Sequence, residues 1–187
     1  MDYFSSTPFF EHRDKIHNIL AKIPTAKEPV GWKYKGSFSV GGFEYLGFNE
    51  TSDLLFVISS SGRIVIDLSN LEMIVRNSPE QFIIDETFLT CEDFDVLKDK
   101  VIRLAGRQGS ILPTSNKIGE RLVRVSPLYP CEDIIFCPPF EDCLVENFNN
   151  NCIRVYRGFL YCFGFSFSGN YFVIADDEGI QVWEKQQ

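Results

Sequence analysis

The sequence predicts a mainly β protein built from antiparallel meanders. Among its 187 residues are 18 phenylalanines but only four alanines, although alanine is the best helix former. Phenylalanine, isoleucine, valine and tyrosine fit the pleated, half-buried surface of a sheet. The length is close to that of one typical domain, and 44% of the residues are apolar while 24% are charged. These values predict one folded domain over residues 1–187 and argue against intrinsic disorder.

The N-terminal segment predicts a helix over residues 7–23, packed outside the β core. Pro8 follows Thr7 at the position where proline often begins a helix, and Pro24 ends the segment. The spacing of the apolar residues places them on one helical face. These residues are Phe9, Ile16, Leu20 and Ile23.

Residues 32–187 are expected to form the β core, because apolar residues here alternate or run together between turn-forming residues. The first meander is predicted at 34–40, 43–48, 54–59 and 63–67, with turns at 41–42, 49–53 and 60–62.

The middle of the chain predicts a second helix and then further strands. Thr90 and Asp93 have the spacing of a capping box before a helix at 92–104, and a loop follows at 106–119. Asparagines at 147 and 149–151 are typical of a hairpin tip. The later strands are predicted at 121–126, 133–137, 143–146, 152–157, 160–167, 171–175 and 180–184.

An internal repeat relates residues 42–67 to residues 158–184. Both stretches contain Gly-Phe, a polar turn, an apolar run of four residues and a glycine before the next strand. The apolar run is Leu-Phe-Val-Ile in the first stretch and Tyr-Phe-Val-Ile in the second. The second copy, with Phe165 to Ala175 and Gly179 to Trp183, resembles a blade of a WD40-type β-propeller. This resemblance implies a propeller-like arrangement, of four small blades or an open form, in which each blade stacks on its neighbours.

Over most of the chain after the first helix, the sequence is similar to a group of uncharacterised bacterial proteins. The similarity rests on the segment from Ser52 to Arg63 with Asp67, Glu72 and Arg76, and on the closing hairpin. It implies a bacterial origin and no particular activity.

The bulk chemistry excludes some partners and predicts a compartment. The net charge of −8 disfavours binding to nucleic acid, and the nearest basic group, Arg103, Arg107, Arg121 and Arg124, is typical of a solvated face. The first residues lack the pattern of a secretory signal, which predicts a cytoplasmic location. The uncharged stretch 158–175 contains a Ser-Gly-Asn turn and predicts two strands instead of a membrane helix.

No pattern in the sequence predicts a catalytic, metal or cofactor site. His12 and His17 are five residues apart and point in different directions on a helix, so they are not expected to share a metal ion, and nothing in the sequence indicates that this helix reaches a pocket. Cys131, Cys137 and Cys143 lack the close spacing of zinc ligands, and the six cysteines are expected to be free thiols that pack in the core. Trp32 and Trp183 would approach each other if the first and last strands meet to close the sheet, and packing in the core or at that seam is favoured over a ligand platform.

The function predicted from these absences is that of a non-enzymatic protein-binding module, of an immunity or regulatory type, with a partner that could be basic. Two alternatives stay open. One is a hydrolase or lyase with a carboxylate site drawn from Asp85, Glu86, Glu141 or Asp142. The other is a structural protein that self-associates through exposed sheet edges.

Overall fold

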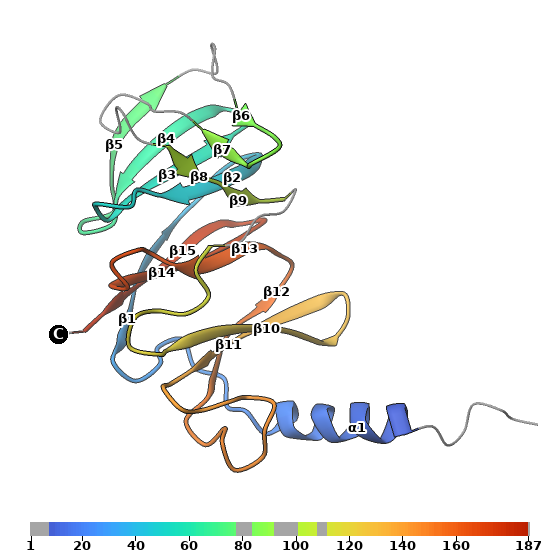
Figure 1. Ribbon diagram of the computed structural model, residues 1–187. Coiled ribbons are helices and arrows are strands. Elements are labelled where there is room, and N and C mark those ends of the chain that lie inside the picture. The colour runs from blue at the N-terminus through green and yellow to red at the C-terminus, as the bar shows by residue number, and fades with distance from the viewer. Residues whose placement is uncertain (1–7, 78–83, 92–100, 108–111, 187) are drawn as a thin grey trace, which may run out of the picture. The chain divides into compact units, whose positions relative to one another are not determined.

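The computed structural model describes residues 8–77, 84–91, 101–107 and 112–186 (Figure 1). It is mainly β, with antiparallel sheets and an N-terminal helix, as the sequence predicts. Its elements are α1 (Pro8–Ala21), β1 (Trp32–Phe38), β2 (Phe43–Phe48), β3 (Leu54–Ser59), β4 (Gly62–Asp67), β5 (Glu72–Asn77), β6 (Ile84–Asp85), β7 (Thr90–Cys91), β8 (Ile102–Arg103), β9 (Ala105–Gly106), β10 (Arg121–Leu128), β11 (Cys131–Cys137), β12 (Ile153–Gly158), β13 (Leu160–Phe165), β14 (Tyr171–Asp176) and β15 (Gly179–Lys185).

The chain divides into two compact units, and each is made of two stretches of sequence. Unit 1 comprises the described part of residues 1–29 together with 118–158. Unit 2 comprises the described part of 30–117 together with 159–187. The expectation of one domain over 1–187 stays a prediction.

Unit 2 contains three antiparallel sheets that pack in layers. Their strand orders are β5-β4-β3-β2-β9, β1-β15-β14-β13 and β6-β7-β8. Strand β3 lies in the middle layer, where Leu55 and Val57 face one hydrophobic cluster while Phe56 and Ile58 face another. The first cluster includes Val173 and Val182 of the sheet β1-β15-β14-β13, and the second includes residues of β7 and β8. Because successive side chains of a strand point to opposite faces, a strand buried on both sides needs an unbroken apolar run.

The internal repeat corresponds to two meanders with the same strand pattern, β2-β3-β4 and β13-β14-β15. Strand β1 adds to the second meander by pairing with β15, with Tyr34 opposite Trp183 (Figure 1). Gly179 permits this pairing, because a side chain there would lie 2.2 Å from the carbonyl oxygen of Phe38. The first and last of these strands therefore pair with each other.

Trp32 and Trp183 approach each other through a shared neighbour. The ring of Phe172 lies 4.9 Å from that of Trp32 and 4.7 Å from that of Trp183, measured between centroids. All three side chains are buried, so the tryptophans pack in the core as the sequence predicts.

Unit 1 consists of the sheet β10-β11-β12 with α1 against one face. Leu20 of α1 and Ile23, which follows the helix, pack against Ile135 of β11. The helix therefore buries the face that its apolar spacing predicts.

Two sequence predictions differ from the structure. Residues 143–146 form turns and not a strand, because the carboxylates of the preceding Glu141 and Asp142 bind backbone N–H groups of this loop. The predicted helix at 92–104 is wrong where Ile102–Arg103 form β8, because Ile102 is buried beside the middle sheet of unit 2. Residues 92–100 of that prediction lie outside the described residues. Strand β5 was not predicted from the sequence.

Replacing Phe172 tests the aromatic core of unit 2. Phe172→Ala removes the ring between the two tryptophans and should lower the free energy of unfolding by about 3–5 kcal/mol. Phe159 is 57% exposed, and Phe159→Ala should change it by less than about 1 kcal/mol. Urea unfolding followed by tryptophan fluorescence measures both. Equal effects of the two replacements would contradict this account of the core.

Candidate functional site

The most unusual surface of unit 1 is the segment that joins β11 to β12. We call residues 138–151 the apolar loop; its sequence contains three acidic residues and no lysine or arginine. Four large apolar side chains of this loop are exposed to solvent. They are Phe140, Leu144, Val145 and Phe148. Contiguous exposed apolar side chains on a folded protein are typical of a binding surface.

Hydrogen bonds at both ends hold the apolar loop in one conformation. The Glu141 carboxylate accepts a bond of 2.8 Å from the backbone N–H of Asn151 and another from the Asn151 side-chain amide. The Asp142 carboxylate accepts the N–H of Leu144 at 2.9 Å. Arg121 of β10 donates to the carbonyl oxygen of Glu141 at 2.6 Å. The exposed side chains are therefore presented by an ordered backbone.

Phe140 combines exposure with an unfavourable backbone conformation. Its side chain is 99% exposed, and its φ of +67° lies in the left-handed region. That region costs a residue with a side chain about 1–2 kcal/mol relative to the right-handed conformation. Neither burial of the ring nor backbone preference explains a phenylalanine here, which makes Phe140 a candidate contact residue.

A groove adjoins the apolar loop on the same unit. It has a volume of about 370 Å³, and Leu144 contributes to its wall. Its other apolar lining comes from Ile16, Leu20, Val125 and Pro127. The basic side chains of His12, Arg13 and His17 line it as well. A second depression of about 260 Å³ shares His17, Leu20 and Pro127 with this groove and extends to Arg154 and Arg157.

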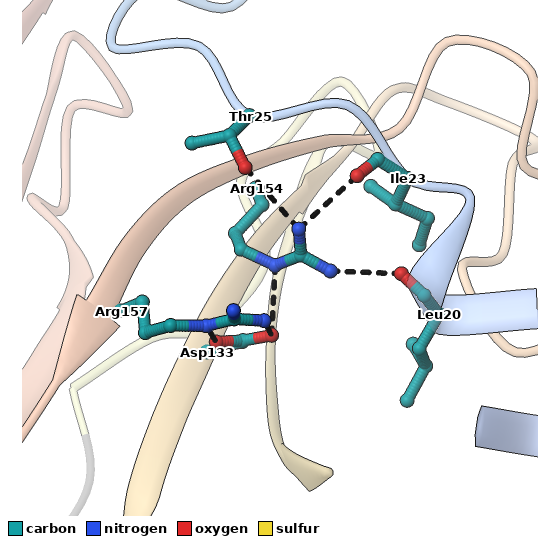
Figure 2. Close-up of polar contacts among 6 residues, drawn as sticks. All are labelled: Leu20, Ile23, Thr25, Asp133, Arg154 and Arg157. Carbon is teal, nitrogen blue, oxygen red and sulfur yellow. Dashed lines mark hydrogen bonds and ion pairs between the residues drawn. The ribbon is translucent and has the colours of Figure 1, made fainter. Parts of the chain in front are cut away.

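A buried carboxylate lies between two arginines beside that depression. Figure 2 shows Asp133 of β11 facing Arg154 and Arg157 of β12. Asp133 accepts bonds of 2.7 Å from Nε of Arg154 and 2.6 Å from Nε of Arg157. The Asp133 side chain is 2% exposed, whereas that of Arg157 is 43% exposed. The group carries a net charge of +1 and is open to solvent at Arg157.

Arg154 also secures the end of the helix. Its Nη2 donates to the carbonyl oxygen of Leu20 at 2.8 Å, and its Nη1 donates to that of Ile23 at 3.1 Å and to Oγ1 of Thr25 at 3.2 Å (Figure 2). The last carbonyls of a helix have no partner within it, and a cation there also interacts favourably with the helix dipole. One guanidinium therefore connects α1 and the chain after it to the sheet.

The charges of this group determine the ionisation of its carboxyl. Burial alone would raise the pKa of Asp133, but hydrogen bonds and charges from Arg157 and Arg154 outweigh it, and the pKa is lowered. The hydrogen bond to Asp133 correspondingly raises the pKa of Arg157. Asp133 is therefore a carboxylate throughout the neutral range. A carboxylate paired in this way is suited to structure and not to proton transfer.

The four carboxylates of the enzyme alternative fall into two pairs, one in each unit. Glu141 and Asp142 lie in the apolar loop of unit 1, where they hold the backbone. Asp85 and Glu86 lie in unit 2, and the Asp85 carboxylate accepts the N–H groups of Thr87 and Phe88 in a turn. Three of the four thus have bonds that explain their presence.

The histidines and arginines singled out in the sequence are also placed. His12 and His17 both line the groove of unit 1, a placement that nothing in the sequence indicates. Arg121 and Arg124 lie in β10, and Arg124 pairs with Glu132. Arg103 and Arg107 belong to unit 2, where Arg107 lies 4.9 Å from the centre of the Tyr161 ring.

The sequence reasoning missed Asp133, Arg154 and Arg157. A signal was present, because Arg154 stands between Ile153 and Val155 in a predicted strand. A charged residue within an apolar strand requires a buried partner. The exposure of Phe140 had no signal, because it depends on the path of the loop.

Neither a comparison with protein-family models nor one with curated protein sequences gives a match to this chain. In the part of the chain that the structure describes, no set of three or more histidine, cysteine or acidic side chains is arranged to hold a metal ion. Within the same residues, no helix has the length and apolar character needed to cross a membrane.

Replacing Asp133 tests the buried ion group. Asp133→Asn leaves the buried Arg154 without its counter-charge and should lower the free energy of unfolding by about 3–5 kcal/mol. The control is Glu132→Gln, one residue earlier in β11, which removes a pair with the half-exposed Arg124 and should cost about 1 kcal/mol or less. Urea unfolding at pH 7 compares them. Similar costs for the two variants would be inconsistent with a special role for Asp133.

The same carboxylate predicts a pH dependence. Because the folded pKa of Asp133 lies below the ordinary value near about 3.9, its stabilisation is complete above about pH 5. The stabilisation is lost as the pH falls through the folded pKa, below about pH 4. The difference in unfolding free energy between the wild type and Asp133→Asn should therefore shrink below about pH 4. A difference that stays constant down to about pH 2 would refute this assignment.

Proposed function

We propose that the protein is a non-enzymatic protein-binding module and that the apolar loop is its docking surface. The observation that carries the proposal is Phe140, a fully exposed ring held at a positive φ by an ordered loop. Proteins retain such costs where function requires them. Phe148, which is 58% exposed in the same loop, adds a second aromatic contact. Aromatic side chains are enriched among the residues that dominate binding energy.

The charge of the loop favours a partner with basic and apolar groups. Glu141, Asp142 and Glu146 lie among the exposed apolar residues, and the whole chain carries a net charge of −8. Opposite charges on two proteins accelerate their association and suppress association with acidic competitors. An immunity or regulatory protein that occupies a basic partner fits this combination.

Two finer expectations from the sequence belong to this proposal. We propose that the layered meanders of unit 2 are blade-like, because each sheet must cover the apolar face of the next. We also propose a cytoplasmic location, where thiols such as the five buried cysteines stay reduced.

The alternatives have less support. A hydrolase or lyase needs carboxylates that converge on a substrate, whereas Glu141, Asp142 and Asp85 hold loops. Self-association has one favourable observation: β5 lies at the edge of its sheet in the described chain, and its Met73 and Ile74 are exposed. It stays a prediction beside the binding module.

Replacing Phe140 separates binding from stability. Phe140→Ala removes the ring and keeps the cost of a positive φ, whereas Phe140→Gly removes both the ring and that cost. The glycine variant should be more stable than the alanine variant by about 1 kcal/mol, because glycine adopts positive φ without penalty. Both variants should lose at least about tenfold in affinity for the partner, because an aromatic anchor contributes more than about 1.4 kcal/mol.

The partner is found by cross-linking from a photoreactive residue at position 148 in an extract of the producing cell, and affinities are then measured with the purified pair. Phe159→Ala serves as the control, since Phe159 is an exposed phenylalanine outside the loop. Glu146→Gln should weaken binding more at low salt than at high salt. If Phe159→Ala weakens binding as much as Phe140→Ala, the loop is not the docking surface.

A further inference from the structure

Three cysteines of unit 1 lie together at the base of the apolar loop. Cys137 ends β11, Cys152 directly precedes β12, and Cys143 lies within the loop. All three are buried in the hydrophobic cluster that includes Leu20 of α1. The thiol of Cys137 lies close enough to the other two to interact with both, and the Cys152 thiol also donates to the Glu141 carboxylate at 3.8 Å. The two cysteines that flank the loop in sequence thus also meet in space.

Strand register sets the separation of Cys137 and Cys152. Phe136 pairs with Ile153 at the end of the β11–β12 ladder, so Cys137 and Cys152 are the next opposed positions. Opposed residues of antiparallel strands have Cα atoms about 4.5–5.5 Å apart. A disulfide requires Cα atoms about 4.4–6.8 Å apart. The register therefore predicts that the backbone at Cys137 and Cys152 has the spacing of a disulfide.

The three thiols differ in ionisation. Hydrogen bonds from Cys143 and Cys152 lower the pKa of Cys137 against the effect of burial, and the charge of Arg121 acts in the same direction. Arg121 is opposite Cys137 in the β10–β11 ladder. The same hydrogen bonds raise the pKa of Cys143 and of Cys152. The thiolate is the reactive form of cysteine, so Cys137 is the nucleophile of the group.

We propose that this cluster is a redox modification site, in which hydrogen peroxide converts Cys137 and Cys152 into a disulfide that closes the apolar loop. The Cys137 sulfur attacks a peroxide oxygen and the O–O bond breaks. One water is released, and Cys137 becomes a sulfenic acid. The Cys152 thiol attacks that sulfur, the S–O bond breaks, and a second water leaves. Each sulfur loses one electron and each peroxide oxygen gains one, while the two thiol protons end in the two waters.

Because all three thiols are buried beneath an ordered loop, the oxidant must enter through a transient local opening of that loop. The apolar loop contributes Cys143 to the cluster, and Phe140, Val145 and Phe148 of this loop face solvent instead of the core. Segments with few buried contacts open more readily than core strands. Once formed, the disulfide restricts residues 138–151 in the unfolded chain and stabilises the folded loop. An effect of oxidation on partner binding rests on the proposed function, whereas disulfide formation does not.

The test treats the folded wild-type chain with one equivalent of hydrogen peroxide and then alkylates the remaining thiols in denaturant. Two of the six thiols should become resistant to alkylation, and non-reducing peptide mapping should find the residues around Cys137 and Cys152 linked. Cys162 is the internal control, because burial alone raises its pKa. It should stay alkylated while Cys137 reacts at least tenfold faster. The thermal unfolding midpoint should rise on oxidation and return after reduction with dithiothreitol.

Variants and other outcomes keep the proposal falsifiable. Cys143→Ser should still form the disulfide, whereas Cys152→Ser should stop at an oxidised Cys137. The proposal is overturned by a link between Cys137 and Cys143, by equal oxidation of Cys162, or by a zinc ion that copurifies with the reduced chain and protects the three thiols. Oxidation without any change in partner binding would leave the disulfide established and count only against its influence on the docking surface.

Discussion

The arrangement of unit 1 depends on one buried carboxylate. Asp133 pairs with Arg154, and Arg154 in turn binds the carbonyl oxygen of Leu20 in the last turn of α1 and that of Ile23 just beyond it. A guanidinium this deeply buried would be costly without a counter-charge, and both carbonyls would lose a charged donor without the guanidinium. The ion group and the apolar contacts of Leu20 and Ile23 therefore act together at one junction between helix and sheet.

This junction also determines where the surface features of unit 1 lie. The groove is bounded by α1 and by β10, so its width follows from the position of the helix. The apolar loop begins and ends on the two strands that carry Asp133 and Arg154. A rigid base allows a short loop to present exposed aromatic rings without losing them to the core. The stability of the strands at the base of the apolar loop therefore supports the exposure of the rings at its tip.

The sequence predicted the meanders well because their physical cause is local. Leu54 to Ser59 and Phe43 to Phe48 have the predicted bounds, since apolar runs between glycine and polar turns leave little choice of register. Prediction failed where tertiary contacts decide the outcome. The segment 143–146 contains strand-forming residues, but the bonds of Glu141 and Asp142 hold it as a loop. Ile102 lies in the segment that the sequence predicts as a helix, yet in β8 it pairs with Cys91.

The pairing of β1 with β15 has a consequence for biosynthesis. These strands lie at residues 32–38 and 179–185, so the sheet β1-β15-β14-β13 joins segments that a ribosome makes far apart in time. All of unit 1 except its first segment is synthesised in between. Until the last strand emerges, β1 has an uncovered edge and the ring of Trp32 lacks the neighbours that bury it. Between the synthesis of β1 and that of β15, the nascent chain therefore exposes an unpaired strand edge that other chains can bind. Contact with a chaperone is most useful during that interval.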